Sequence, residues 1–224
     1  RQSIVHMARS PGLDLDVISH QQGPLAVEQI VHITIQLVEL LKFIRDPKNN
    51  TRAKPIVHGD IKPSNIVFNL EDDSLQLIDW GSSVWAQCDK DGHSTSTNVM
   101  DLMSGDLQQT NSRMGDIYFI GEEQLNGGLS TPRFDEQGMA ATIYALASGQ
   151  SSRYGYKVIT ASSLGLPQML AKALDGMLGD DEKLRIKAGD YLFNNLNLLK
   201  NTVMASTPTK PKLANAIPIW LKST

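Results

Sequence analysis

Apolar positions recur at helical spacing in several parts of the chain. Residues 27 to 45 carry such side chains three or four positions apart, at Ile30, Ile33, Leu37, Leu40, Leu41 and Ile44. This spacing predicts an amphipathic helix that ends before "DPKNNTRAKP". The stretch "DEQGMAATIYALAS", residues 135 to 148, is apolar on most sides and predicts a buried helix closed by Gly149. Two further helices are expected near 165 to 178 and 186 to 200.

The pattern changes between the first two helices. "IVF" and "LQLI" are short and rich in β-prone residues, and the turn residues "NLEDDS" separate them. We expect a β-hairpin from 66 to 78. Residues 82 to 114 are rich in Ser, Thr, Asp and Gly without clear periodicity, which predicts a long loop.

Composition narrows the class of protein. The 224 residues are 41% hydrophobic and 20% charged, enough for an ordinary buried core. A net charge of −3 does not favour nucleic acid or an anionic membrane as the main partner. The single cysteine, Cys88, allows no intrachain disulfide, and its simplest interpretation is a spare loop thiol. No apolar run reaches the roughly 20 residues of a membrane span, and the first residues do not resemble a secretory leader, so a cytoplasmic location is expected.

The expected hairpin would bring polar side chains together. Asn65 comes directly before its first strand and Asp79 directly after its second, and neighbouring strands lie about 4.8 Å apart. An amide oxygen and a carboxylate are hard ligands that suit Mg²⁺. Asp60 precedes Asn65 in a loop stiffened by Pro63, and Lys62 adds a compact positive charge suited to phosphate oxygens.

The two motifs "HGDIKPSN" and "DWG" resemble signatures of the eukaryotic-like Ser/Thr protein kinase family. The resemblance implies that Asp60 is the catalytic base and that Lys62 contacts the γ-phosphate of ATP. It implies that Asn65 and Asp79 bind Mg²⁺, with Trp80 in the place of a phenylalanine. The resemblance also implies that the protein binds ATP, Mg²⁺ and a protein substrate. His58 occupies the position of a structural histidine that packs near that aromatic ring.

The resemblance extends along the chain in the same order. "GDIYFIGEEQL", 115 to 125, is similar to the end of an activation segment, and Glu123 stands where the family has a glutamate paired with an arginine, here Arg185. Asp135 matches the residue that holds the catalytic-loop backbone. The expected fold is protein-kinase-like, a mostly α-helical C-terminal lobe with short β-hairpins around the catalytic loop. Residues 1 to 200 would form this lobe, with an activation segment at 79 to 123, and 201 to 224 a linker ("STPTKPK") and tail.

Several features depart from the family pattern. Gly59 replaces an arginine that normally pairs with a phosphorylated activation loop, so activity is not expected to depend on such phosphorylation. Asp116 stands where Ser/Thr kinases usually have a threonine. The sequence holds neither a G-x-G-x-x-G loop nor a strand with a V-A-I-K-like lysine. "SIVHMARSPGLDLDVI" resembles the hinge and the first helix beyond it, so the N-terminal lobe is expected to be missing and the isolated chain inactive.

Two alternatives stay open at this point. A small-molecule phosphotransferase of the aminoglycoside or choline type also uses H-G-D…N…I-D-W, and Gly59 and Trp80 favour it. A pseudokinase that only binds a partner is the other. The acceptor, whether Ser/Thr, Tyr or a small molecule, is not fixed by the sequence. The nine Ser and Thr residues between 82 and 112 are either autophosphorylation sites or part of a polar insert.

Overall fold

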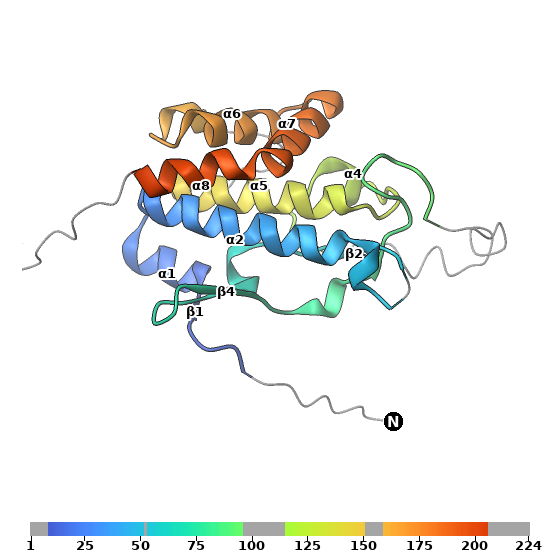
Figure 1. Ribbon diagram of the computed structural model, residues 1–224, viewed down its shortest axis with the longest axis horizontal. Coiled ribbons are helices and arrows are strands. Elements are labelled where there is room, and N and C mark those ends of the chain that lie inside the picture. The colour runs from blue at the N-terminus through green and yellow to red at the C-terminus, as the bar shows by residue number, and fades with distance from the viewer. Residues whose placement is uncertain (1–8, 52, 96–114, 151–158, 206–224) are drawn as a thin grey trace, which may run out of the picture.

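The computed structural model of the chain describes residues 9–51, 53–95, 115–150 and 159–205. Within them the fold is mainly helical (Figure 1). The helices are α1 (Leu15–Gln22), α2 (Val27–Arg45), α4 (Glu122–Leu125), α5 (Pro132–Ser148), α6 (Gln168–Met177), α7 (Glu182–Asn194) and α8 (Leu196–Ala205). The strands are β1 (Leu13–Asp14), β2 (Ile56–Val57), β3 (Ile66–Asn69), β4 (Ser74–Leu77) and β5 (Val84–Trp85).

Helices α2 and α5 run side by side through the centre of the molecule (Figure 1). Helix α2 spans the residues that its apolar periodicity predicts, and its inward positions are fully or almost fully buried. Helix α5 begins at Pro132, three residues before the predicted start. The reason is local: Thr131 is the N-cap, its hydroxyl accepting from the Arg133 amide at 3.5 Å, and proline is favoured in the first turn. Gly149 closes α5 at φ 69°, as predicted.

The predicted helix near 186 to 200 is in fact two helices, α7 and α8. Asn195, at φ −112° and ψ 24°, leaves the helical conformation and ends α7, and its side chain donates to the Tyr191 carbonyl at 2.8 Å. Helix α7 begins earlier than predicted, where Asp181 caps it by accepting from the Leu184 amide at 3.0 Å. Helix α6 lies within the predicted range 165 to 178.

The strands form two small antiparallel sheets. The predicted hairpin is present as β3 and β4, with Ile66 opposite Leu77, and β1 adds a third strand that was not predicted. The prediction of a continuous loop from 82 to 114 was wrong at its start, because β5 pairs there with β2. Strands of two residues are too short to show an alternating pattern, so periodicity carries no signal for them. Residues 96–114, the linker at 206–212 and the tail lie outside the described residues.

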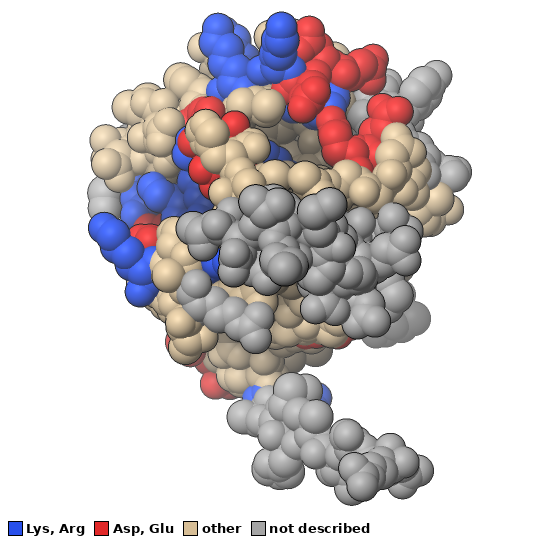
Figure 2. All heavy atoms as spheres, turned by 90° about the vertical axis from the view of Figure 1, so that its right-hand side faces the viewer, with Lys and Arg blue, Asp and Glu red and all other residues tan. Residues whose placement is uncertain are grey.

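Membrane-spanning character and the distribution of charge can both be examined in the structure. Among the described residues, no helix combines the length and the apolar character needed to cross a bilayer. Figure 2 shows basic and acidic side chains intermingled along the upper part of the face it draws. The field of such mixed groups falls off quickly with distance.

Candidate active site

The loop before β3 carries three of the predicted site residues. A short 3₁₀ turn, Pro63–Asn65, leads into β3, and proline presets the backbone of its first residue. The Ile78 amide donates to the Asn65 carbonyl at 2.9 Å. The two ends of the hairpin are therefore joined by main chain, which brings the backbone of Asp79 close to that of Asn65.

Asp60 lies at the centre of a group of polar side chains. It is 7% exposed. Its Oδ1 accepts from the Asp116 amide at 2.9 Å, and its Oδ2 accepts from Asn65 Nδ2 at 2.9 Å and lies 2.9 Å from Lys62 Nζ. The structure thus brings Asp60, Lys62 and Asn65 together. A carboxylate has about four lone-pair sites, so roughly one stays available for a further donor.

Asp116 adds a second carboxylate to this group. Its Oδ2 lies 4.0 Å from Lys62 Nζ, while its Oδ1 accepts from the Tyr118 amide at 3.0 Å. Lys62 therefore faces two carboxylates, of Asp60 and Asp116, and its side chain is 22% exposed. An ammonium has three donors, so Lys62 keeps a donor for a third partner.

Asn65 and Asp79 suit a divalent cation. The Asn65 amide nitrogen donates to both the carbonyl and the carboxylate of Asp60 at 2.9 Å, which leaves its buried Oδ1 without a hydrogen-bond partner among the described residues. Asp79 is exposed, and its Oδ1 accepts from the Gly81 amide at 3.4 Å. Asp79 also holds a left-handed backbone, φ 58° and ψ 68°. Non-glycine residues in this conformation carry strain and are concentrated at functional sites.

His58 is buried behind the loop as a neutral ring. Its Nε2 lies 3.0 Å from the Ile78 carbonyl, which needs a donor, and its Nδ1 accepts from the Asp60 amide at 3.3 Å. Burial lowers the pKa of His58, although the Ile78 carbonyl and the nearby Asp60 and Asp79 carboxylates oppose this shift. The ring packs edge-on against Trp80 at 4.8 Å between centroids, and this predicted contact is confirmed.

Asp135, on α5, holds the backbone of the loop before β3, as the family resemblance implies. Its two oxygens accept from the His58 and Gly59 amides, each at 2.8 Å. Burial raises the pKa of Asp135 to about 7; the two amide hydrogen bonds oppose this rise, and the neighbouring Glu136 adds to it. Asp135 is 3% exposed, so its link to the loop is shielded from water.

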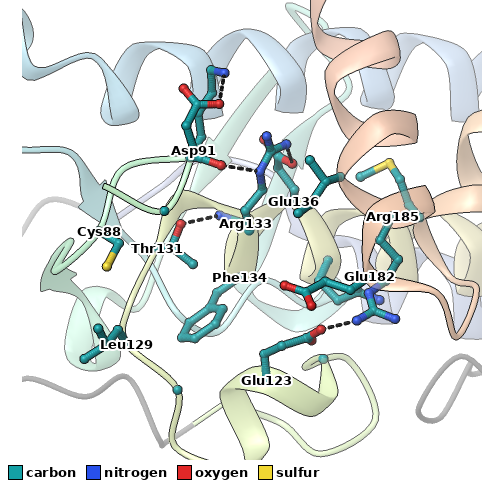
Figure 3. A pocket seen from close by; sticks show the side chains of 17 residues that line it. Cys88, Asp91, Glu123, Leu129, Thr131, Arg133, Phe134, Glu136, Glu182 and Arg185 are labelled. Atoms are coloured by element: carbon teal, nitrogen blue, oxygen red, sulfur yellow. Dashed lines mark hydrogen bonds and ion pairs between the residues drawn. The ribbon is translucent and has the colours of Figure 1, made fainter. Parts of the chain in front are cut away.

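The predicted pairing of Glu123 with Arg185 is also present. Arg185 reaches from α7 to the carboxylate of Glu123 on α4, and the two side chains point toward each other in Figure 3. Arg185 also donates to the Gly179 and Asp180 carbonyls at 2.9 and 2.8 Å. The Glu123 side chain is 40% exposed, so water screens this pair in part.

A buried ion-pair network centred on Glu136 was not predicted. Glu136 accepts from Arg45 and Arg133, each at 2.7 Å, and Arg133 also donates to Asp190 at 2.9 Å. The Arg45 guanidinium lies 4.0 Å from the centroid of the Phe193 ring. Only the spatial meeting of three helices reveals this network, since its members are spread from residue 45 to residue 193.

The cavity in Figure 3 has a volume of about 510 Å³ and lies between the loop after β5, α4, the start of α5 and the first turns of α7. Apolar side chains of Leu129, Phe134, Met177 and Ile186 line it beside Cys88. None of Asp60, Lys62, Asn65 and Asp79 lines it, so this cavity is separate from the polar group around Asp60. Burial raises the pKa of the Cys88 thiol, which agrees with an unreactive side chain.

Among the described residues, one other group has metal-ligand chemistry. The ligand atoms of Asp89, Asp91 and His93 lie within 4.8 Å of one another in a turn. The Asp89 carboxylate already accepts from the amides of Asp91 and His93 at 2.9 Å. These bonds account for the cluster as the closure of a polar turn.

Comparisons with known proteins agree with this arrangement. Residues 3–189 match the family described as "Protein kinase domain". The chain is 24% identical over 139 residues to Serine/threonine-protein kinase PrkC of Bacillus subtilis (strain 168), covering 62% of this chain and 18% of that protein. It is 26% identical over 154 residues to Serine/threonine-protein kinase PknE of Mycobacterium tuberculosis (strain ATCC 25618 / H37Rv), covering 69% of this chain and 23% of that protein. The chain thus spans about a fifth of the length of these curated relatives.

Proposed function

Since the chain belongs to the protein kinase family, we propose that it supplies the catalytic loop and metal ligands for phosphoryl transfer from ATP to a protein Ser or Thr hydroxyl. The observation that carries the proposal is the convergence of Asn65 and Lys62 on one oxygen of Asp60, each at 2.9 Å. A base, a phosphate-binding cation and a metal ligand thereby share one small space. Ser and Thr are proposed as the acceptor residues because both relatives are named serine/threonine-protein kinases.

In the proposed reaction the substrate hydroxyl oxygen bonds to the γ-phosphorus as the bond to the β–γ bridging oxygen breaks. Asp60 accepts the hydroxyl proton on the lone pair that its three donors leave available. Asn65 and the Asp116 amide hold this carboxylate in a single orientation. Lys62 places its remaining donor against the γ-phosphate oxygens, where negative charge is concentrated.

Asn65 Oδ1 and the Asp79 carboxylate are the proposed ligands for Mg²⁺. Their oxygen chemistry fits this cation, and the fixed donation of the Asn65 amide to Asp60 leaves its Oδ1 available as a ligand. Mg²⁺ would neutralise charge on the phosphates and orient them. The strained backbone of Asp79 is consistent with a carboxylate held for binding rather than for packing.

The domain assignment is part of the same proposal. Residues 1 to 200 would be the C-terminal lobe with an activation segment at 79 to 123, and residues 201 to 224, of which the first five continue α8, a linker and tail. The 224 residues contain no G-x-G-x-x-G loop, so a second lobe outside them would cover the phosphates. We expect the chain alone to be inactive for this reason. The cytoplasmic location stays a prediction.

The test measures transfer of labelled phosphate from ATP by the whole protein in the presence of Mg²⁺. Asp60→Asn should lower kcat by about 10²- to 10⁴-fold, the usual contribution of a positioned general base. Asp72→Asn is the matched control, because Asp72 is exposed in the β3–β4 turn. Label on Ser or Thr of a peptide library supports the proposal. Label on aminoglycosides or choline alone indicates the small-molecule alternative, and no label on any acceptor indicates a binding module.

A further inference from the structure

The helix that ends the proposed activation segment is joined to the catalytic loop by a side chain with no role in the family motifs. Gln124, on α4, is 2% exposed. Its Nε2 donates to the Gly59 carbonyl at 2.7 Å. A buried hydrogen bond between elements 65 residues apart fixes their relative position, because losing it leaves a buried carbonyl without a partner.

Gly59 is held through both sides of its peptide backbone. Its amide donates to Asp135 at 2.8 Å, and its carbonyl accepts from Gln124. Its φ of 82° lies in the left-handed region that favours glycine. Since residue 59 has no side chain, its contact with α4 runs through main chain alone.

The space around this bond is closed. A Cβ atom on Gly115 would lie 2.7 Å from the Gly59 carbonyl oxygen and 3.0 Å from Gln124 Nε2. The next residue, Asp116, donates its amide to Asp60 at 2.9 Å. Residues 115 to 124 therefore contact the catalytic loop at both Gly59 and Asp60.

The neighbouring residue anchors the same helix on its other side. Glu123 pairs with Arg185 of α7, while Gln124 reaches the catalytic loop. Two consecutive side chains of a four-residue helix thus bind two different parts of the molecule. A helix this short has little stability of its own, so these contacts determine where it lies.

We propose that Gln124 is a positioning residue that holds Asp60 in place through the Gly59 peptide. This inference rests on the proposed function, in which Asp60 is the base. The Gln124 bond prevents rotation of the Gly59–Asp60 peptide, whose carbonyl is the Gly59 oxygen that Gln124 binds. The hydrogen bond between Gln124 and Gly59 joins two uncharged groups, so it forms without phosphorylation of the chain.

Gln124→Met in the whole protein tests the proposal, because methionine keeps the length of the side chain but cannot donate. Gln124→Glu is the second variant and keeps the shape of the side chain while removing the donor. Gln168→Met is the matched control, since Gln168 is exposed at the start of α6. Hydrogen exchange is followed by mass spectrometry in peptides covering residues 56 to 62.

Both Gln124 variants should speed exchange in these peptides about tenfold, the equivalent of one hydrogen bond, while Gln168→Met changes nothing. If the wild-type protein transfers phosphate, both Gln124 variants should lower kcat several-fold and leave the KM for ATP unchanged. Wild-type exchange in both Gln124 variants, or wild-type kcat in them, would overturn the proposal. Faster exchange in a protein that transfers no phosphate would contradict the proposed function instead and leave the positioning of the loop by Gln124 supported.

Discussion

Replacing Asp135 by asparagine probes how the loop around Asp60 is held. Asp135 accepts from two amides, and both bonds are 2.8 Å long. Asparagine keeps one acceptor oxygen but turns its NH₂ group toward the other backbone N–H. One hydrogen bond is lost and two donors face each other in a buried place.

The cost can be worked from these contacts. A buried donor left without a partner costs about 1–3 kcal/mol, and this one is shielded from water because Asp135 is 3% exposed. We therefore expect Asp135→Asn to lower the free energy of unfolding by about 2–3 kcal/mol. Urea unfolding followed by circular dichroism measures this difference, and the dependence of the unfolding free energy on urea concentration should be the same for both proteins.

The pH dependence gives a second, independent signature. Burial raises the pKa of Asp135 to about 7, above the ordinary value of 3.8 that the unfolded chain keeps. Between these two pH values the folded protein holds a proton on Asp135 that the unfolded chain has released. The contribution of this proton to the free energy of unfolding is therefore complete below about pH 4 and is lost as the pH rises through about 7. The amide introduced by Asp135→Asn does not titrate. The stability penalty of this substitution should therefore shrink between about pH 4 and about pH 7.

Asp175→Asn is the matched control. Asp175 also accepts from two backbone amides, those of Ala161 at 2.8 Å and Ser162 at 3.2 Å, but far along the chain from the catalytic loop. It should destabilise the protein without speeding hydrogen exchange at residues 56 to 62. An Asp135→Asn protein with wild-type stability and wild-type exchange in that loop would refute the reasoning, and a penalty that grows with pH would refute the assigned pKa direction.

Other predictions concern buried and half-buried charges. Glu136→Gln should cost about 3 kcal/mol in thermal unfolding, because it leaves two largely buried arginines without their carboxylate; an unchanged Tm would show that the network is not needed. Glu123→Gln should lower stability by less than about 1 kcal/mol in the same assay, since the carboxylate is 40% exposed and water screens its charge in part. A loss above about 2 kcal/mol would contradict this weak contribution of an exposed pair. The His58 imidazole should take up its proton at a lower pH than an ordinary histidine in NMR titrations, because burial lowers its pKa; proton uptake at a higher pH than in an ordinary histidine would count against its burial as a neutral ring.

Much of the site was readable from the sequence because its residues are close together along the chain. Asp60, Lys62 and Asn65 lie within six positions, and the hairpin pattern placed Asp79 beside them. Pairings over longer separations, such as Asp135 with the loop and Glu123 with Arg185, came only from the family resemblance. Periodicity alone gives no signal for them.

The remaining features depend on the third dimension. Gln124 looks like any polar residue of a short helix, and only its burial against Gly59 reveals its contact. The network around Glu136 joins three helices at single positions. The break at Asn195 was missed because apolar spacing continues across it into α8, while the backbone of this single residue leaves the helical conformation.

Mg²⁺-dependent ATP binding, measured by calorimetry, tests the central claim most directly. The chain is compared with a form extended at its N-terminus by about a hundred residues of its natural sequence, enough for a second lobe. We predict that only the extended form binds ATP, and that Asp79→Asn abolishes its response to Mg²⁺. Absence of binding by both forms would contradict the account and leave the polar group around Asp60 without a catalytic role.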